Sequence, residues 1–251
     1  MKIIITKDYD SMSRKAADLV EELLNAEPEG LFSIPGGESP AGLAKEFCLR
    51  VREGRIDPTG VKFVQLDDWV GIGPDDEGSC SNFLRDNLFS QMSKPFADVF
   101  TFNGAAGNID AQLQAQDAFI RKYGPITAQV LGIGMNGHLG FNEDGVDFSL
   151  RSHRIPLSGV TLGVQKKYFG GKDLPLTEGI TMGVAQIMES KTVILLASGE
   201  KKAEIMAKAL TEPVSNQIPA TVLQNHANCI YLLDEAAASR LPDGLANVER
   251  A

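Results

Sequence analysis

The sequence predicts an α/β protein: a single doubly wound, Rossmann-like, mostly parallel sheet with helices on both faces. Three observations support this fold class. Short apolar runs alternate with amphipathic stretches along the whole chain. The apolar runs are continuous, which is typical of strands buried on both faces. No internal repeat or linker-like change of composition interrupts the 251 residues, so we expect one domain over 1–251.

Seven apolar runs are the expected strands, and the last of them is expected at an edge of the sheet: 2–6, 30–34, 61–66, 99–103, 128–134, 191–199 and 228–234. Four stretches with apolar residues at helical spacing are the expected helices: 10–26, 41–54, 108–124 and 200–210. Asp10 or Ser11 can cap the first helix, and Gly54 closes the second. The segment 144–178, rich in glycine and charge and weak in periodicity, is a candidate lid over a binding site.

The composition of the chain argues against several classes of binding partner. A net charge of −9 and an isoelectric point near 4.9 argue against nucleic-acid and anionic-membrane partners, but not against a small anionic substrate. The three cysteines are widely separated, which predicts neither a disulfide framework nor a zinc site and fits a reducing cytoplasm. No stretch approaches the ~20 apolar residues of a membrane span. The sequence leaves open whether the protein is a monomer or a homo-oligomer.

Ligands of doubly wound folds bind beyond the carboxyl ends of the strands. The first candidate place is "PGGESP" (35–40), where Gly36 and Gly37 allow a tight turn and Ser39 precedes Pro40 at the start of a helix. Such a turn can hold an anion on backbone N–H groups, or can be an ordinary strand–helix connection. It lacks the lysine of a nucleotide-binding P-loop.

The second place is "LDDWVG" (66–71). Asp67 and Asp68 are adjacent, so an extended backbone cannot direct both toward one ligand. We expect one of them to face the cleft and the other to be solvated or to cap a helix. The alternative is a loop acid pair with Trp69 packed over it.

The third place is "LGIGMNGHLGFNEDG" (131–145), whose glycines let the chain bend around a ligand. His138 is the residue in this loop whose ordinary pKa of about 6.5 suits proton transfer at neutral pH. Glu143 can accept a hydrogen bond from one imidazole nitrogen and leave the other for substrate. Asn136 can hold the same ring or the substrate. A structural loop histidine is the alternative.

A lysine in "GEKKAEI" (199–205) can reach a phosphate, although spacing does not choose between Lys201 and Lys202. One histidine–carboxylate pair is a poor metal site, and no serine elbow is present, so neither metal nor cofactor is expected. A base, a histidine–carboxylate relay and an anion cradle together suit proton transfer on a small phosphorylated molecule.

The stretches "VQLDDWVGI" (64–72), "LGIGMNGHLGFNEDG" and "IPATVL" (218–223) resemble the glucosamine-6-phosphate deaminase/isomerase family, and the resemblance extends along nearly the whole chain. It implies an enzyme without a cofactor that converts an amino-sugar 6-phosphate to a ketose 6-phosphate and ammonia. The sister family, 6-phosphogluconolactonase, typically has an aspartate–glutamate–arginine run at the positions of 67–69 and a serine–leucine–phenylalanine run at those of 141–143. These two differences favour the deaminase family.

The resemblance also implies roles. Asp67 would be the base that moves a proton from C2 to C1, and His138 would open the sugar ring with Glu143 and Asn136 positioning it. Lys202 would bind phosphate. The remaining expected substrate-binding residues are Gly36, Gly37, Ser39, Asp68 and Gly137.

Three positions depart from the glucosamine pattern. Leu162 stands where the family has a phosphate-binding arginine, Gly36 where it has threonine or serine, and Glu38 where a small residue is usual. Trp69 and the stretch 78–84 resemble galactosamine-6-phosphate isomerases, which also lack the arginine. The resemblance therefore implies glucosamine or galactosamine 6-phosphate as the substrate. The alternatives are a lactonase-type hydrolase and a non-enzymatic sugar-phosphate sensor.

Overall fold

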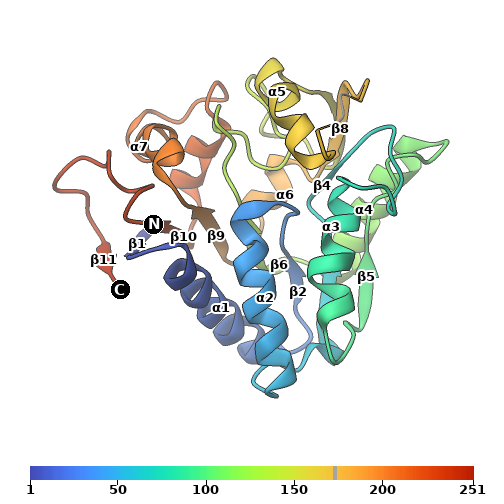
Figure 1. The fold of residues 1–251 in the computed structure, drawn as a ribbon, viewed down its shortest axis with the longest axis horizontal. Coiled ribbons are helices and arrows are strands. Elements are labelled where there is room, and N and C mark those ends of the chain that lie inside the picture. Colours follow the sequence, from blue (N-terminus) through green and yellow to red (C-terminus); the bar gives the residue numbers. More distant parts are fainter. Residues whose placement is uncertain (172–173) are drawn as a thin grey trace.

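A parallel sheet of eight strands forms the centre of the protein in the computed structural model, which describes residues 1–171 and 174–251 (Figure 1). The strand order is β11-β1-β10-β9-β6-β2-β3-β5, and neighbouring strands pair in parallel. The strands are β1 (Lys2–Thr6), β2 (Leu31–Ser33), β3 (Lys62–Val64), β5 (Asp98–Phe100), β6 (Ile126–Leu131), β9 (Val193–Ala197), β10 (Cys229–Asp234) and β11 (Val248–Arg250). The predicted fold class is confirmed.

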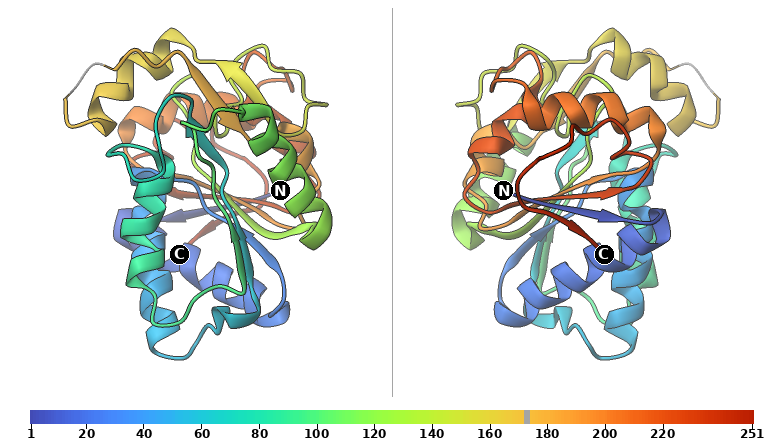
Figure 2. Two further views of the ribbon diagram at one scale, coloured as in Figure 1. Left: turned by 90° about the vertical axis from the view of Figure 1, so that its right-hand side faces the viewer. Right: turned by 90° about the vertical axis from the view of Figure 1, so that its left-hand side faces the viewer.

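Helices cover both faces of this sheet (Figure 2). One face carries α1 (Tyr9–Ala26), α2 (Glu38–Arg52) and α3 (Cys80–Asn87), and the other carries α4 (Ile109–Tyr123), α6 (Val184–Met188) and α7 (Ala203–Thr211). Short 3-10 turns lie at Pro58–Gly60, Phe89–Gln91, Glu200–Lys202 and Pro219–Asn225. Successive residues of a strand point to opposite faces of the sheet. In β1, Ile4 packs on the face covered by α1, α2 and α3, while Ile3 and Ile5 pack on the opposite face.

Two predicted details of the elements are wrong. The N-cap of α1 is Asp8, whose carboxylate accepts a hydrogen bond from the Ser11 N–H at 2.8 Å, so Asp10 and Ser11 already lie within the helix. The strand β10 is not an edge strand, because β1 pairs with one side of it and β9 with the other. The edges of the sheet are β11 and β5.

A second, antiparallel sheet lies above the carboxyl ends of the large one, with the order β4-β8-β7 (Figure 1). Its strands are β4 (Asp67–Trp69), β8 (Glu178–Thr181) and β7 (His153–Pro156). Helix α5 (Gly159–Tyr168) lies beside it, and Trp69 packs with Phe141 and Phe169 in a small apolar core. The sequence did not predict these elements, because strands this short show no clear periodicity.

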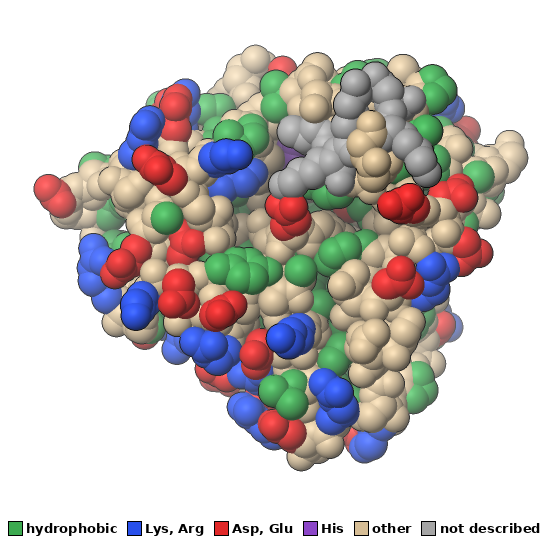
Figure 3. All heavy atoms as spheres, viewed as in Figure 1, with side chains coloured by type: hydrophobic (Ala, Val, Ile, Leu, Met, Phe, Trp, Pro, Cys, Tyr) green, Lys and Arg blue, Asp and Glu red, His purple; other side chains and the backbone are tan. Residues whose placement is uncertain are grey.

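The proposed lid segment 144–178 therefore contains β7 and α5, and its residues 172–173 lie outside the described residues. That it moves stays a prediction. Acidic and basic side chains are interspersed over the described residues of the face in Figure 3. None of the described helices is both long enough and apolar enough to cross a membrane.

The buried Arg50 guanidinium offers a test of the α1–α2 packing. It contacts Asp18 at 2.6 Å, Glu21 at 3.0 Å and Glu46 at 2.7 Å. Arg50→Met should lower the free energy of unfolding by about 2 kcal/mol, because three carboxylates, two of them largely buried, lose their charge-assisted hydrogen bonds to the guanidinium. The exposed Arg55→Met should change it by less than about 1 kcal/mol. Urea unfolding of the two variants measures the difference, and equal effects would contradict it.

Candidate active site

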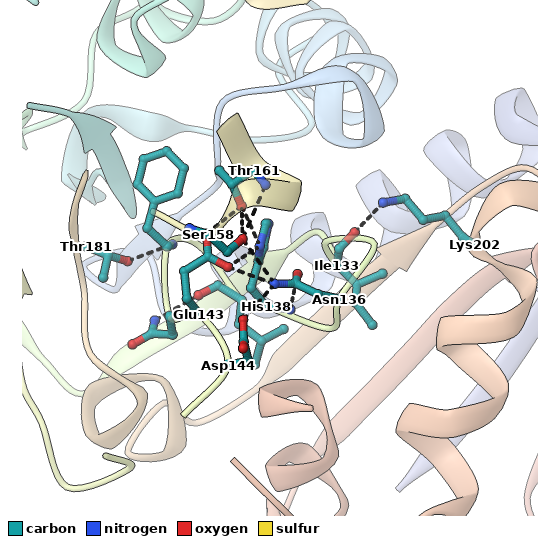
Figure 4. Close-up of polar contacts among 12 residues, drawn as sticks. Ile133, Asn136, His138, Glu143, Asp144, Ser158, Thr161, Thr181 and Lys202 are labelled. Carbon is teal, nitrogen blue, oxygen red and sulfur yellow. Dashed lines mark hydrogen bonds and ion pairs between the residues drawn. The ribbon is translucent and has the colours of Figure 1, made fainter. Parts of the chain in front are cut away.

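The loop after β6 brings His138 and Glu143 together, as predicted (Figure 4). The His138 Nδ1 lies 3.2 Å from the Glu143 Oε2. Gly134 makes room for the imidazole, because a Cβ at this position would come within 2.3 Å of the His138 Nε2. At least one glycine of this loop is therefore required by the position of the histidine ring.

The Glu143 carboxylate is buried, yet it is held ionised. Its Oε2 accepts hydrogen bonds from the Asn136 Nδ2 at 2.8 Å and from His138. Its Oε1 accepts from the Thr161 hydroxyl and from the Ser158 N–H at 3.3 Å. Burial alone would raise the pKa of Glu143, but the bonds from His138, Thr161 and Asn136 lower it to about 2. An ionised Glu143 favours the tautomer with the proton on Nδ1 and leaves Nε2 to act on a substrate.

Asn136 contacts Glu143 through its side-chain amide, and so positions the carboxylate rather than the imidazole ring (Figure 4). Ser158 and Thr161 were not among the predicted site residues. They lie at the amino end of α5, where the Ser158 hydroxyl caps the helix by accepting from the Thr161 N–H at 3.3 Å. A capping serine in "LSGVT" (157–161) predicts a helix start, but it carries no signal that this helix begins at the carboxylate of a distant loop.

The back of the histidine loop is fixed by the segment "IPATVL". The Gly137 carbonyl accepts a hydrogen bond from the Ala220 N–H at 2.8 Å. Gly137 has a φ of +85°, and a Cβ there would come within 2.6 Å of the Ile218 Cγ2. The structure therefore gives Gly137 a role in loop geometry, and its predicted contact with substrate stays a prediction.

Asp67 is buried at 7% exposure, and its Oδ1 has no hydrogen-bond partner among the described residues. Burial and the neighbouring charge of Asp68 raise the pKa of Asp67 to about 8. A buried carboxyl group with an unpaired oxygen is expected at a site where a ligand completes its contacts. This is the aspartate that the sequence predicted as a base.

The neighbouring Asp68, a predicted substrate-binding residue, directs its carboxylate to groups of the protein itself, and its binding of substrate stays a prediction. Its Oδ1 accepts from the N–H groups of Trp69 and Cys80, both at 2.9 Å. Its Oδ2 accepts from the Ser81 N–H and hydroxyl and from the Gln65 amide. Asp68 is 1% exposed, so its carboxylate is used inside the protein, where it accepts hydrogen bonds from the first two N–H groups of α3; the N-cap residue of this helix is Ser79. The expectation that one of the two aspartates caps a helix agrees with this geometry.

Asp67 and the histidine loop meet at β8. Asp67 lies opposite Thr181 in the β4–β8 pair, and the Thr181 hydroxyl accepts a hydrogen bond from the Phe141 N–H at 3.2 Å. The rings of Trp69 and Phe141 also pack together, with centroids 4.9 Å apart. The small antiparallel sheet thus joins the candidate base to the loop that carries His138 and Glu143.

The predicted anion-binding residues lie at the same end of the large sheet. Gly37 is the N-cap of α2 with a φ of +126°, and Ser39 lies in the first turn of this helix. The Lys202 ammonium donates to the Ile133 carbonyl at 2.6 Å, next to the histidine loop (Figure 4). The turn before Lys202 is held by Asp234, whose carboxylate accepts from the Gly199 N–H at 3.0 Å. Phosphate binding by these residues stays a prediction.

The protein is thus an α/β protein with two polar features at the carboxyl edge of its large sheet: a buried carboxyl group and a histidine–carboxylate pair. A search of family models matches residues 7–232 to the family of glucosamine-6-phosphate isomerases/6-phosphogluconolactonase. A glucosamine-6-phosphate deaminase of Geobacillus sp. is 36% identical over 97% of this chain and 97% of its own length. A glucosamine-6-phosphate deaminase of Clostridium perfringens is 36% identical over 96% of this chain and its full length. The chain belongs to this family.

Solved structures agree with the assignment. A monomeric glucosamine-6-phosphate deaminase superposes with a TM-score of 0.91 at 30% identity, covering 96% of this chain and 100% of that one. The 6-phosphogluconolactonase of Trypanosoma brucei superposes with a TM-score of 0.71 at 17% identity, covering 96% of this chain and 98% of that one. The second likeness concerns the fold alone.

The raised pKa of Asp67 predicts how stability depends on pH. The folded protein holds this proton up to about pH 8, whereas the unfolded chain loses it near its ordinary value of about 3.9. Between these values Asp67 lowers the free energy of unfolding as pH rises, by at most roughly 1.4 kcal/mol per pH unit. Asp67→Asn has no carboxyl group to titrate at this position and so lacks this pH-dependent destabilisation. The difference in melting temperature between the variant and the wild type should therefore increase in favour of the variant from pH 5 to pH 8.

Thermal unfolding at several pH values measures this gain. The exposed Asp243→Asn is the matched control, and it should follow the wild type across the same range. A constant difference between Asp67→Asn and the wild type from pH 5 to pH 8 would show that Asp67 is not held protonated.

Proposed function

We propose that this protein is an amino-sugar-6-phosphate deaminase/isomerase. With water, it converts a 2-amino-2-deoxyaldose 6-phosphate to the corresponding ketose 6-phosphate and ammonia. The names of its relatives at 36% identity over nearly the full length support this chemistry. The observation that carries the proposal is the buried, unpaired Asp67 oxygen beside the loop of the histidine–carboxylate pair.

In this proposal Asp67 is the base for the isomerisation. Its carboxylate removes the proton from C2 of the ring-opened amino sugar and returns it to C1. A carboxylate whose conjugate acid has a pKa near 8 is a stronger base than an ordinary aspartate. Its pKa also lies closer to neutral pH, where general acid–base catalysis is most efficient. The cationic amino group of the substrate would favour the ionised form of Asp67 when the complex forms.

The pair of His138 and Glu143 acts before this step. The His138 Nε2 moves a proton between the ring oxygen and the C1 hydroxyl as the pyranose opens. Glu143 is ionised and accepts a hydrogen bond from the Nδ1–H of His138, so the imidazole stays in one tautomer. During the proton transfer, the negative charge of the carboxylate stabilises the imidazolium that forms transiently. Asn136 and Thr161 keep that carboxylate in place.

The phosphate lies far from the reacting carbons and supplies binding energy that orients them. Lys202, with the backbone N–H groups of the Gly36–Gly37 turn and Ser39, is proposed to bind it. Segment 144–178 is proposed to cover the bound sugar, since α5 begins at the Glu143 carboxylate. We retain the expectation of a cytoplasmic protein, and its oligomeric state is to be measured.

Two sugar epimers are candidates. Glucosamine 6-phosphate is favoured by the names of the relatives. Galactosamine 6-phosphate is favoured by Trp69 and Cys80, and by Leu162 in place of an arginine. Leu162 packs against the apolar core that contains Trp69, so these two positions form one apolar unit in this chain.

Ammonia release from glucosamine 6-phosphate and galactosamine 6-phosphate, measured side by side, tests the proposal. We expect turnover of at least one of them, and a loss of at least about 1000-fold in Asp67→Asn, which keeps the fold but lacks the base. A protein that releases ammonia from neither sugar contradicts the proposal. Hydrolysis of 6-phosphogluconolactone would then indicate a lactonase, and binding without turnover a sensor.

Replacing His138 tests the ring-opening step separately. His138→Gln should lower turnover of the cyclic substrate by about 100-fold, since a positioned acid–base group contributes roughly that much. The defect should shrink with an acyclic analogue of the amino sugar, which needs no ring opening. Rates with both substrates in the variant and the wild type give the comparison, and an equal defect with both would assign His138 to another step.

A further inference from the structure

Gly36 and Gly37 are adjacent, but the structure requires glycine at the two positions for different reasons. Gly37 has a φ of +126° and open space around a built Cβ. Gly36 is not among the positive-φ residues, yet a Cβ there would lie 3.0 Å from the Cys80 Cβ, 3.1 Å from its Cα and 3.3 Å from its Sγ. A side chain at position 36 would therefore approach Cys80, the first residue of α3, more closely than ordinary van der Waals contact, and one of the two residues would have to move by a few tenths of an ångström.

The same residue of α3 is tied to the strand that carries the proposed base. The Cys80 N–H donates to the Asp68 Oδ1 at 2.9 Å, and the following Ser81 N–H donates to the Asp68 Oδ2 at 3.0 Å. Asp68 directly precedes Trp69 and follows Asp67 in β4. A continuous path of close contacts thus runs from Gly36 through Cys80 and Asp68 to Asp67.

The properties of Cys80 fit a steric role in this path. Burial and the charges of Asp67 and Asp68 raise the pKa of the Cys80 thiol well above its ordinary value, so the thiol stays neutral. A Cβ at position 36 would meet the Cα and Cβ of Cys80 as well as its sulfur, and Cys80 contacts Asp68 through its backbone N–H. Such contacts define a distance better than the end of a flexible side chain does.

We propose that Cys80 is a positioning residue whose close approach to Gly36 sets the spacing between the phosphate loop and Asp67. This inference rests on the proposed function, because it takes the loop as the phosphate site and Asp67 as the base. A sugar phosphate has a fixed separation between its phosphate and C2. The spacing therefore decides whether a substrate bound at its phosphate end presents its C2 proton to Asp67.

Three variants and one control test the contact. Gly36→Ala inserts a methyl group against Cys80, Cys80→Gly removes the Cβ and sulfur that it would meet, and the double variant combines them. Gly107→Ala is the matched control, because a Cβ there meets nothing within 4 Å and its φ is not positive. For each protein we would measure kcat and KM on the better of the two amino-sugar phosphates, inhibition by inorganic phosphate, and melting temperature.

We expect Gly36→Ala to lower kcat about tenfold, since a shift of a few tenths of an ångström misplaces C2. Its inhibition constant for inorganic phosphate should stay within about twofold of the wild type, because that ion occupies only one end of the site. The double variant should regain most of the lost kcat relative to Cys80→Gly alone. Gly107→Ala should match the wild type.

Two results would overturn the inference: additive losses in the double variant, or a loss of phosphate binding in Gly36→Ala as large as its loss of kcat. A wild-type protein that releases no ammonia refutes the proposed function instead. The spacing is then tested by crystal structures of Gly36→Ala and the double variant. An increased separation of the Cα atoms of residues 36 and 67 that the double variant reverses supports the inference, and an unchanged separation refutes it.

Discussion

The site depends on two buried carboxyl groups that the protein treats in opposite ways. Glu143 receives hydrogen bonds at both oxygens and has a pKa lowered to about 2. Asp67 lies beside a like charge, has one oxygen without a hydrogen-bond partner in the described part of the chain, and has a pKa raised to about 8. Separated pKa values of this kind assign the two groups to different tasks. Glu143 pairs with the His138 imidazole, and Asp67 keeps one carboxyl oxygen without a hydrogen-bond partner among the described residues.

Both carboxyl groups are positioned by structure added above the large sheet. The small antiparallel sheet pairs Asp67 with Thr181 and connects it to the loop of His138 through Phe141. Helix α5 completes the hydrogen bonds of Glu143 from its first turn. The large parallel sheet thus supplies a rigid edge, while the elements on top of it determine which carboxyl group is satisfied.

Much of the fold was predictable, because strands buried on both faces produce long apolar runs that local pattern detects. The errors concern pairing and short elements. The position of β10 inside the sheet results from β1 and from the C-terminal strand β11 at the edge, and no property of residues 229–234 signals it. The strands β4, β7 and β8 have three or four residues each, too few for a period to be visible.

The sequence by itself determined the fold class, the three places where candidate ligand-binding residues lie, and the possible pairing of His138 with Glu143, because these follow from local pattern and from spacing within one loop. Only the tertiary structure decided that the Asp67 Oδ1 has no hydrogen-bond partner within 1–171 and 174–251, whereas Asp68 accepts from the first N–H groups of α3. It also decided that Ser158 and Thr161 complete the Glu143 site. Adjacent aspartates are chemically identical in the sequence. Their difference arises from the helix N-terminus that packs against one of them, a contact between segments separated along the chain.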